Sequence, residues 1–214
     1  MNEQLDLDKY QDKKLIAFDL YGTCIYYNKN LLELKKILSW ISKNTVSELR
    51  KILQTHPINI EDVWFNIPDK IIKDINKLTQ KNIESAGIYT DTLNTLKYLR
   101  EKWYKLALIS NLSKKYEKPL RDLIPAWIFD YEALSFNVWE MKPNPWIFNY
   151  IRDESWIDFK DMVMVWDNLD LDIKWAQKVW IDWILVDRKT KWINYCEKNN
   201  IVIVNTISDL MNIL

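Results

Sequence analysis

Four side chains of this sequence could do chemistry together, although they lie far apart along the chain. Asp19, Ser110 and Asp167 each stand at the end of a short apolar run, and Lys142 opens a proline-rich stretch. Two carboxylates brought together repel each other unless a proton or a cation lies between them. Mg²⁺ favours one or two carboxylates together with phosphate oxygens, and a lysine would balance the remaining negative charge. These residue types therefore indicate metal-assisted chemistry on a phosphorylated compound.

The apolar runs before these residues predict strands that are buried on both faces, as in a parallel sheet. The predicted strands span residues 15–18, 106–109, 129–134, 162–165, 181–186 and 201–204. Helical spacing of apolar residues predicts helices over 89–102, 143–154 and 169–179. Alternating strands and helices predict a doubly wound α/β fold, in which ligands bind beyond the carboxyl ends of the strands. The four side chains are therefore expected at one edge of the sheet.

Residues 28–86 break this alternation, because they read as three or four helices without a strand. Thr45 with Glu48 resembles a capping box that opens one of these helices. We therefore expect an α-helical cap over 28–86, inserted into an α/β core formed by 14–27 and 87–214. Residues 1–13 read as a polar tail.

Composition excludes several classes of protein. The 214 residues carry 30 Lys+Arg and 30 Asp+Glu, so no basic excess points to nucleic-acid binding. The sequence contains no apolar run long enough to cross a bilayer, and its first residues lack a secretory signal. Cys24 and Cys196 are expected as reduced thiols. We expect a cytoplasmic protein that binds a small phosphorylated substrate, without nucleic-acid or membrane partners.

The four candidate residues and their neighbours resemble the four motifs of the haloacid dehalogenase (HAD) superfamily, in the subfamily with an α-helical cap. The matching segments are Phe18-Asp19-Leu20-Tyr21-Gly22-Thr23, Leu108-Ile109-Ser110-Asn111, Lys142-Pro143-Asn144-Pro145-Trp146-Ile147-Phe148, and Val165-Trp166-Asp167 continuing to Asp172. They occur in the family's order, and the resemblance covers nearly all of the chain from Leu15. It implies a hydrolase, specifically a phosphatase.

The resemblance also implies a role for each of these residues. Asp19 would attack phosphorus and form an aspartyl-phosphate, which water then hydrolyses. Asp19, Asp167 and the backbone carbonyl of Tyr21 would bind Mg²⁺. Lys142 would pair with both Asp19 and the phosphate.

The remaining motif residues would surround the phosphate or support the site. Ser110 and its neighbouring N–H groups would hold a phosphoryl oxygen. The other residues assigned to phosphate binding are Tyr21, Gly22, Thr23 and Asn111, and Thr23 would also brace the loop after Asp19. Asp172 and Asn168 would support the site from behind, with Asp172 orienting Lys142 or a metal-bound water.

One position departs from the family's phosphatase pattern. Most phosphatases of the family carry a second aspartate two residues after the nucleophile, which protonates the leaving group. This chain has Tyr21 there, as in the metal-independent dehalogenase branch. That branch needs an arginine early in the cap, whereas residues 24–49 contain none. Metal-dependent phosphate chemistry is therefore favoured, with 2-haloacid dehalogenation by Asp19 or a non-catalytic domain of the same fold as alternatives.

The balance of glycine and tryptophan is unusual. The chain has 2 glycines, Gly22 and Gly87, beside 12 tryptophans, whereas an average chain carries about 7% glycine. Tryptophan stands where the family pattern has glycine at positions 103, 139, 166, 175, 180 and 183. Some uncultured bacterial lineages read the codon UGA as glycine, and another alternative code reads it as tryptophan. We hypothesise that many of these tryptophans are glycine in the host, an idea that UGG codons at 166, 175 and 180 would contradict.

Overall fold

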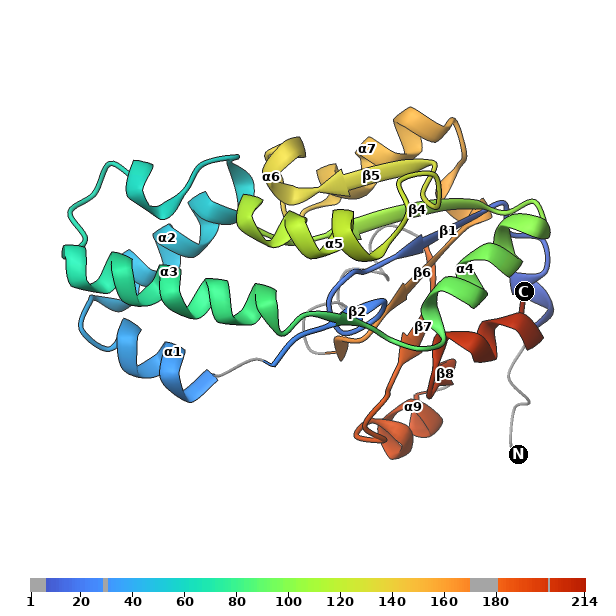
Figure 1. The fold of residues 1–214 in the computed structure, drawn as a ribbon. Coiled ribbons are helices and arrows are strands. Elements are labelled where there is room, and N and C mark those ends of the chain that lie inside the picture. The colour runs from blue at the N-terminus through green and yellow to red at the C-terminus, as the bar shows by residue number, and fades with distance from the viewer. Residues whose placement is uncertain (1–6, 29–30, 170–180, 200) are drawn as a thin grey trace.

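A six-stranded parallel sheet organises the chain in the computed structural model, which describes residues 7–28, 31–169, 181–199 and 201–214 (Figure 1). The strand order is β5-β4-β1-β6-β7-β8, and every neighbouring pair is parallel. The strands are β1 (Leu15–Phe18), β4 (Lys105–Ser110), β5 (Tyr131–Leu134), β6 (Met162–Trp166), β7 (Asp182–Val186) and β8 (Ile203–Val204). The predicted doubly wound α/β fold is confirmed.

Both faces of the sheet are buried, which explains why its strands read as continuous apolar runs. In β1, Ile16 and Phe18 join the apolar core on one face, while Leu15 and Ala17 join the core on the other. The first core also takes residues from α4 (Thr92–Glu101), α5 (Glu117–Leu123) and η5 (Ile207–Asn212). The second takes residues from α7 (Pro145–Ser155) and α9 (Ile193–Lys198). Helices on both faces thus hold the strand ends in fixed positions.

The helical insertion forms a cap beyond the carboxyl ends of the strands (Figure 1). It consists of α1 (Leu31–Leu38), α2 (Lys43–Thr55), the 3₁₀ turn η2 (Ile60–Asp62) and α3 (Asp69–Glu84). These elements share an apolar cluster of their own, which includes Ile37, Leu49 and Leu78. The expectation of an inserted helical region is confirmed, whereas its division from the core at residues 28 and 86 stays a prediction.

The predicted start of the second cap helix was wrong. Its N-cap is Ser42, whose side chain accepts a hydrogen bond from the N–H of Thr45 at 3.1 Å. Thr45 therefore lies in the first turn of α2 and does not open it. Both Ser42 and Thr45 suit an N-cap by residue type, and the chain uses the earlier one.

A short antiparallel ribbon, not expected from the sequence, carries the chain into and out of the cap. β2 (Ile25–Tyr26) precedes the cap, β3 (Gly87–Ile88) follows it, and the two strands pair with each other. A Cβ atom at Gly87 would lie 2.6 Å from the end of the exposed Tyr26 side chain, so a larger residue at position 87 would displace that ring. The two crossings between core and cap are thereby fastened together.

The shorter elements connect these parts. They are η1 (Asp8–Tyr10), η3 (Lys114–Tyr116), α6 (Ser135–Val138) and η4 (Phe159–Asp161). η1 lies within the predicted polar tail, yet Tyr10 is buried in the core and its hydroxyl donates to the carbonyl of Trp183 at 3.1 Å. The predicted helix over 169–179 lies outside the described residues except for its first position. Among the described helices, none has the length and apolar character needed to span a bilayer.

Candidate active site

Three of the four candidate residues lie at the ends of three adjacent strands. Asp19 follows β1, Ser110 ends β4, and Asp167 follows β6, and β1 lies between the other two strands. The ladder aligns Phe18 with both Leu108 and Val165, and the N–H of Asp19 donates to the carbonyl of Val165 at 2.9 Å. The parallel register therefore brings Asp19, Ser110 and Asp167 to the edge of the sheet that faces the cap.

Lys142 completes the group through an ion pair with Asp19. Its Nζ lies 2.8 Å from Oδ1 of Asp19, and the two side chains are only 8% and 15% exposed. A lysine buried to this extent needs a partner, because an isolated buried ammonium is costly. The contact joins residues 123 positions apart in sequence, and it fixes both charged groups at one point of the site.

Asn111 positions Lys142 through two backbone contacts. Its side-chain nitrogen donates to the carbonyl of Lys142 at 2.7 Å, and its side-chain oxygen accepts from the N–H of Lys142 at 2.7 Å. Both polar atoms of the amide are used in this way, so the Asn111 side chain holds the lysine, and its predicted part in phosphate binding stays a prediction. Reciprocal contacts of this kind carry no signal in a single sequence.

Ser110 is buried at the end of β4, and the loop that follows it is held by a serine that the motifs did not indicate. The hydroxyl of Ser135 lies 3.1 Å from the nitrogen of Leu112, whose N–H it accepts, and 3.2 Å from the oxygen of Leu112, to which it donates. Ser135 is fully buried at the start of α6. It therefore fixes the backbone of the loop in which the predicted phosphate-binding N–H groups lie.

Gly22 is required by its contact with Asp167 as well as by its backbone. Its φ is +97°, in the region that favours glycine. A Cβ atom at this position would lie 2.0 Å from Oδ2 of Asp167. The loop after Asp19 is thus packed directly against the second carboxylate, as a shared ligand site requires.

Thr23 supports the nucleophile loop from inside the protein. The residue is fully buried, and its predicted part in phosphate binding stays a prediction. Its carbonyl accepts a hydrogen bond from Arg188 at 2.8 Å, which fits the other predicted role, bracing the loop. The Thr23 hydroxyl has no hydrogen-bond partner among the described residues.

Tyr21 directs its hydroxyl toward the protein. The hydroxyl donates to the carbonyl of Tyr116 at 2.9 Å. The Tyr21 ring meets the rings of Tyr27 and Tyr116 edge-on, with centroid distances of 5.1 and 5.9 Å. Burial, and then the neighbouring tyrosines, raise the pKa of the Tyr21 phenol well above its usual range, so the phenol stays protonated.

The group at the strand ends fits a magnesium ion by its chemistry. Asp19 and Asp167 supply two carboxylates, and the backbone carbonyl of Tyr21 is a third candidate oxygen ligand. No set of three or more Asp, Glu, His or Cys side chains suited to a metal occurs among the described residues. A site with two carboxylates and one carbonyl matches Mg²⁺, which keeps its other coordination positions for water and phosphate oxygens. Asp172, predicted to support the site, lies outside the described residues, and Asn168 is exposed directly after Asp167.

Trp166 is buried in the core next to Lys142. The residue is 2% exposed, and its ring centroid lies 6.2 Å from that of Trp183. The ammonium of Lys142 lies 5.9 Å from the Trp166 ring centroid. The indole N–H has no hydrogen-bond partner among the described residues, a costly arrangement for a buried donor.

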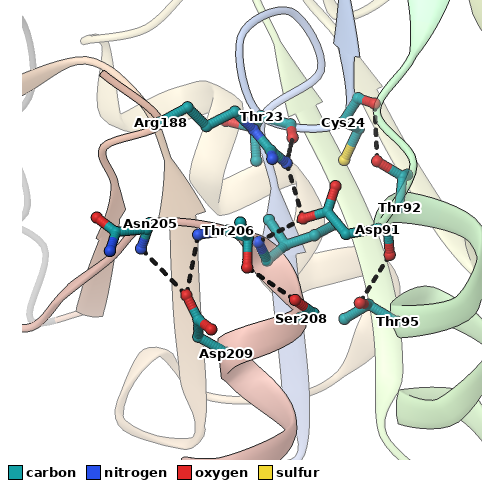
Figure 2. A network of polar contacts seen from close by, with 11 residues as sticks. Thr23, Cys24, Asp91, Thr92, Thr95, Arg188, Asn205, Thr206, Ser208 and Asp209 are labelled. Atoms are coloured by element: carbon teal, nitrogen blue, oxygen red, sulfur yellow. Dashed lines mark hydrogen bonds and ion pairs between the residues drawn. The ribbon is translucent and has the colours of Figure 1, made fainter. Parts of the chain in front are cut away.

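A polar network that no motif indicated ties the segments just before and just after the cap insertion to residues that follow β7 (Figure 2). Arg188, just after β7, donates through one nitrogen to the carbonyl of Thr23 and to Oδ2 of Asp91 at 3.1 Å. The same Asp91 oxygen accepts from the N–H of Ile207 at 2.8 Å, and Thr92 donates to the carbonyl of Cys24 at 2.9 Å. Both chain crossings between core and cap are thereby tied to the C-terminal part of the chain, through Arg188 after β7 and Ile207 in η5.

These features define a class of protein: a doubly wound α/β core with a helical cap inserted directly after the strand that carries a candidate nucleophile. The model of the haloacid dehalogenase-like hydrolase family matches residues 16–186. The chain belongs to this family, as its motifs predicted.

Individual relatives agree with this assignment. The phosphoglycolate phosphatase of Aliivibrio fischeri is 25% identical in an alignment of 189 residues that covers 78% of this chain and 81% of that protein. The crystal structure of a HAD phosphatase from Thermococcus onnurineus gives a TM-score of 0.62 at 24% identity, over 94% of this chain and 97% of its own. A mutant HAD family enzyme from Bacteroides thetaiotaomicron, in complex with magnesium and inorganic phosphate, gives 0.62 at 21%, over 86% and 98%. The structural likeness confirms the fold.

Proposed function

We propose that this protein is a Mg²⁺-dependent phosphatase that hydrolyses a small phosphorylated metabolite through an aspartyl-phosphate on Asp19. The observation that carries the proposal is the buried contact of 2.8 Å between Lys142 and Asp19, at the sheet edge where Asp167 also lies. A carboxylate held in this way is a preformed nucleophile whose charge is balanced before the substrate arrives. The magnesium and phosphate bound by the relative from Bacteroides thetaiotaomicron support the same chemistry.

Each residue has a distinct part in the proposed reaction. A carboxylate oxygen of Asp19 forms a bond to phosphorus while the bond from phosphorus to the leaving oxygen of the substrate breaks, and water then attacks phosphorus and breaks its bond to Asp19. Lys142 stays next to Asp19 and pairs with the phosphoryl oxygens, while Ser110 and the N–H groups of its loop hold another of these oxygens. Asp19, Asp167 and the Tyr21 carbonyl would hold Mg²⁺, which neutralises charge on the phosphoryl group. The cap would cover the site and exclude bulk water.

The proposal is tested by phosphate release from a panel of phosphorylated metabolites. Phosphoglycolate belongs in the panel because one relative is a phosphoglycolate phosphatase. We expect turnover that needs Mg²⁺, that stops in EDTA and returns on adding Mg²⁺, and that is absent from Asp19→Asn. Chloride release from 2-chloropropionate that EDTA leaves unchanged would contradict the proposal in favour of dehalogenation. No turnover with any substrate, and no phosphoryl group on Asp19, would favour a non-catalytic domain.

A further inference from the structure

The proposed reaction raises the question of how the leaving group obtains a proton. When Asp19 attacks, the bond between phosphorus and the leaving oxygen breaks, and its electron pair stays on that oxygen. An alkoxide is strongly basic, so alkyl phosphates need an acid that donates a proton as the bond breaks. Such an acid contributes about 10²–10⁴-fold and works best when its pKa lies near the working pH.

The three charged side chains described at the ends of the central strands already have other tasks. Asp19 is the nucleophile, and Lys142 is paired with it at 2.8 Å. Asp167 packs against Gly22 and, in the proposed function, holds the metal. The position two residues after the nucleophile, where an acid would face the leaving group, is Tyr21.

Tyr21 is a poor proton donor for geometric reasons. Its hydrogen is already donated to the carbonyl of Tyr116 at 2.9 Å, so the hydroxyl is fixed against the protein. Tyr27 and Tyr116 pack against its ring and hinder rotation toward a substrate.

The cap side of the same cluster locks this arrangement. The side-chain nitrogen of Asn82, in α3, donates to the hydroxyl of Tyr116 at 2.9 Å. Lys115, beside Tyr116, donates to the side-chain oxygen of Asn76 at 2.8 Å, also in α3. The carbonyl that receives the Tyr21 hydrogen therefore belongs to a segment held by the cap.

Building on the proposed function, we propose that the substrate is an acyl phosphate or a phosphoanhydride, whose leaving group departs as a weakly basic anion, and not an alkyl phosphate. In the first step the Asp19 oxygen bonds to phosphorus, and a carboxylate or phosphate leaves with the electron pair and without a proton. In the second step a water oxygen bonds to phosphorus, the bond between Asp19 and phosphorus breaks, and the water protons pass to phosphate and solvent. The site thus needs no acid for the first step.

The test is the dependence of kcat/KM on the basicity of the leaving group. A series of substituted phenyl phosphates gives the slope, and acetyl phosphate and glycerol phosphate extend it. We expect a steep fall in kcat/KM as the leaving group becomes more basic, with acetyl phosphate at least about 10²-fold better than glycerol phosphate. Tyr21→Asp should flatten the slope and raise glycerol phosphate turnover about 10²-fold or more.

Two further variants separate the possible outcomes. Tyr21→Phe keeps the ring without the hydroxyl and should retain the steep slope, and circular dichroism checks that both Tyr21 variants fold. A shallow slope in the unmodified protein would overturn the inference. If Tyr21→Phe, or His56→Gln at the chain's one histidine, then made the slope steep, that residue would be the acid. A phosphoryl group on Asp19 with a shallow slope refutes this inference alone, whereas its absence with every donor refutes the proposed function as well.

Discussion

At the scale of single residues, the pairing of Lys142 with Asp19 can be compared with a surface pair of the same length. Lys14 and Asp161 are also 2.8 Å apart, but Lys14 is 66% exposed. Exposed ion pairs contribute about 0–1 kcal/mol to stability, because water screens the charges. Lys142, in contrast, is buried beside the proposed nucleophile. Lys142→Gln should lower kcat by about 10²–10³-fold, as does removal of other groups that stabilise transition-state charge. Lys14→Gln, the matched control, should leave kcat unchanged.

Steady-state kinetics on the best substrate of the panel measures both variants, and a urea titration confirms that both are folded. Equal kcat values for Lys142→Gln and the unmodified protein would show that the buried lysine is structural only.

The tryptophans in the left-handed backbone region give a second prediction at this scale. Of the four described non-glycine residues with positive φ, three are tryptophan: Trp103, Trp139 and Trp156, with φ values of 69°, 62° and 58°. Trp103 and Trp156 follow helix ends and are more than nine-tenths exposed, so little packing compensates for their backbone strain. This finding supports the hypothesis that glycine stands at these positions in the host.

Trp103→Gly and Trp156→Gly should each raise the free energy of unfolding by about 1 kcal/mol, since side chains in this region cost about 1–2 kcal/mol. The matched control is Trp127→Gly in an exposed turn without positive φ, where added chain entropy should lower stability slightly. Urea denaturation of the three variants measures the differences. A loss of stability in Trp103→Gly and Trp156→Gly as large as in the control would contradict the argument.

The residues that touch the reaction were easier to predict than those that support them. Asp19, Ser110 and Asp167 follow apolar runs, and parallel strands bring their ends to one edge, so the sequence alone predicted their meeting. Asn111, Ser135 and Arg188 each act through hydrogen bonds to the backbone of a residue far away in sequence. No periodicity or spacing marks such contacts, and Arg188 could have been found only from the structure.

At the scale of elements, the pairing of β2 with β3 and the network around Arg188 (Figure 2) hold together the two chain segments that enter and leave the cap, and we call this region the hinge. Arg188 and Asp91 are 15% and 11% exposed, and the Arg188 guanidinium lies 3.7 Å from the Tyr89 ring centroid. Removing one partner of a pair buried in this way costs about 3–5 kcal/mol in other proteins, because the remaining charge is left in a poorly solvated place. The hinge therefore depends on both charges.

Arg188→Gln should lower the free energy of unfolding by about 3 kcal/mol. It should also loosen the Thr23 carbonyl and so reduce kcat even where the protein is fully folded. Lys118→Gln is the control, because Lys118 and Asp122 form an exposed pair at 2.7 Å. Denaturant titrations and kcat at low denaturant measure the two effects, and an Arg188→Gln variant as stable and as active as the control would contradict this role.

The strands and most helices were predictable because they bury regular apolar patterns. The ribbon was not, because β2 and β3 have two residues each and pair across an insertion of about sixty residues. The start of α2 was misplaced because Ser42 and Thr45 both suit an N-cap, and only the fold decides between them. Sequence patterns thus predicted the sheet and the helices that cover it, whereas the β2–β3 ribbon and the start of α2 depend on contacts that only the fold creates.

At the scale of the whole molecule, the cap touches the core at points that surround the site. Lys115 and Tyr116 of the core contact Asn76 and Asn82 of α3. On the α2 side, the ring of His56 lies 5.3 Å from the ring of Trp139, three residues before Lys142. The cap therefore contacts both the segment that receives the Tyr21 hydrogen and the loop that carries the lysine, so cap and catalytic groups should move together.

A pocket of about 440 Å³ opens beside Asp167, between the nucleophile loop and the segment after β7. Its lining includes Tyr26, Tyr27 and Tyr89 together with Arg188 and Lys191. A volume of this size lies in the range of small-molecule sites, and the pocket adjoins Asp167 but is not lined by Asp19, Ser110 or Lys142.

The central claim is that Asp19 forms a covalent bond to phosphorus during the reaction. The decisive measurement is the intact mass of the protein after brief mixing with acetyl phosphate and Mg²⁺ and quenching in acid, followed by peptide mapping. We expect one added phosphoryl group on the peptide that contains Asp19. This phosphoryl group should be absent from Asp19→Asn and from samples with EDTA. Phosphate release that proceeds equally well in Asp19→Asn, or a phosphoryl group on another residue, would contradict it.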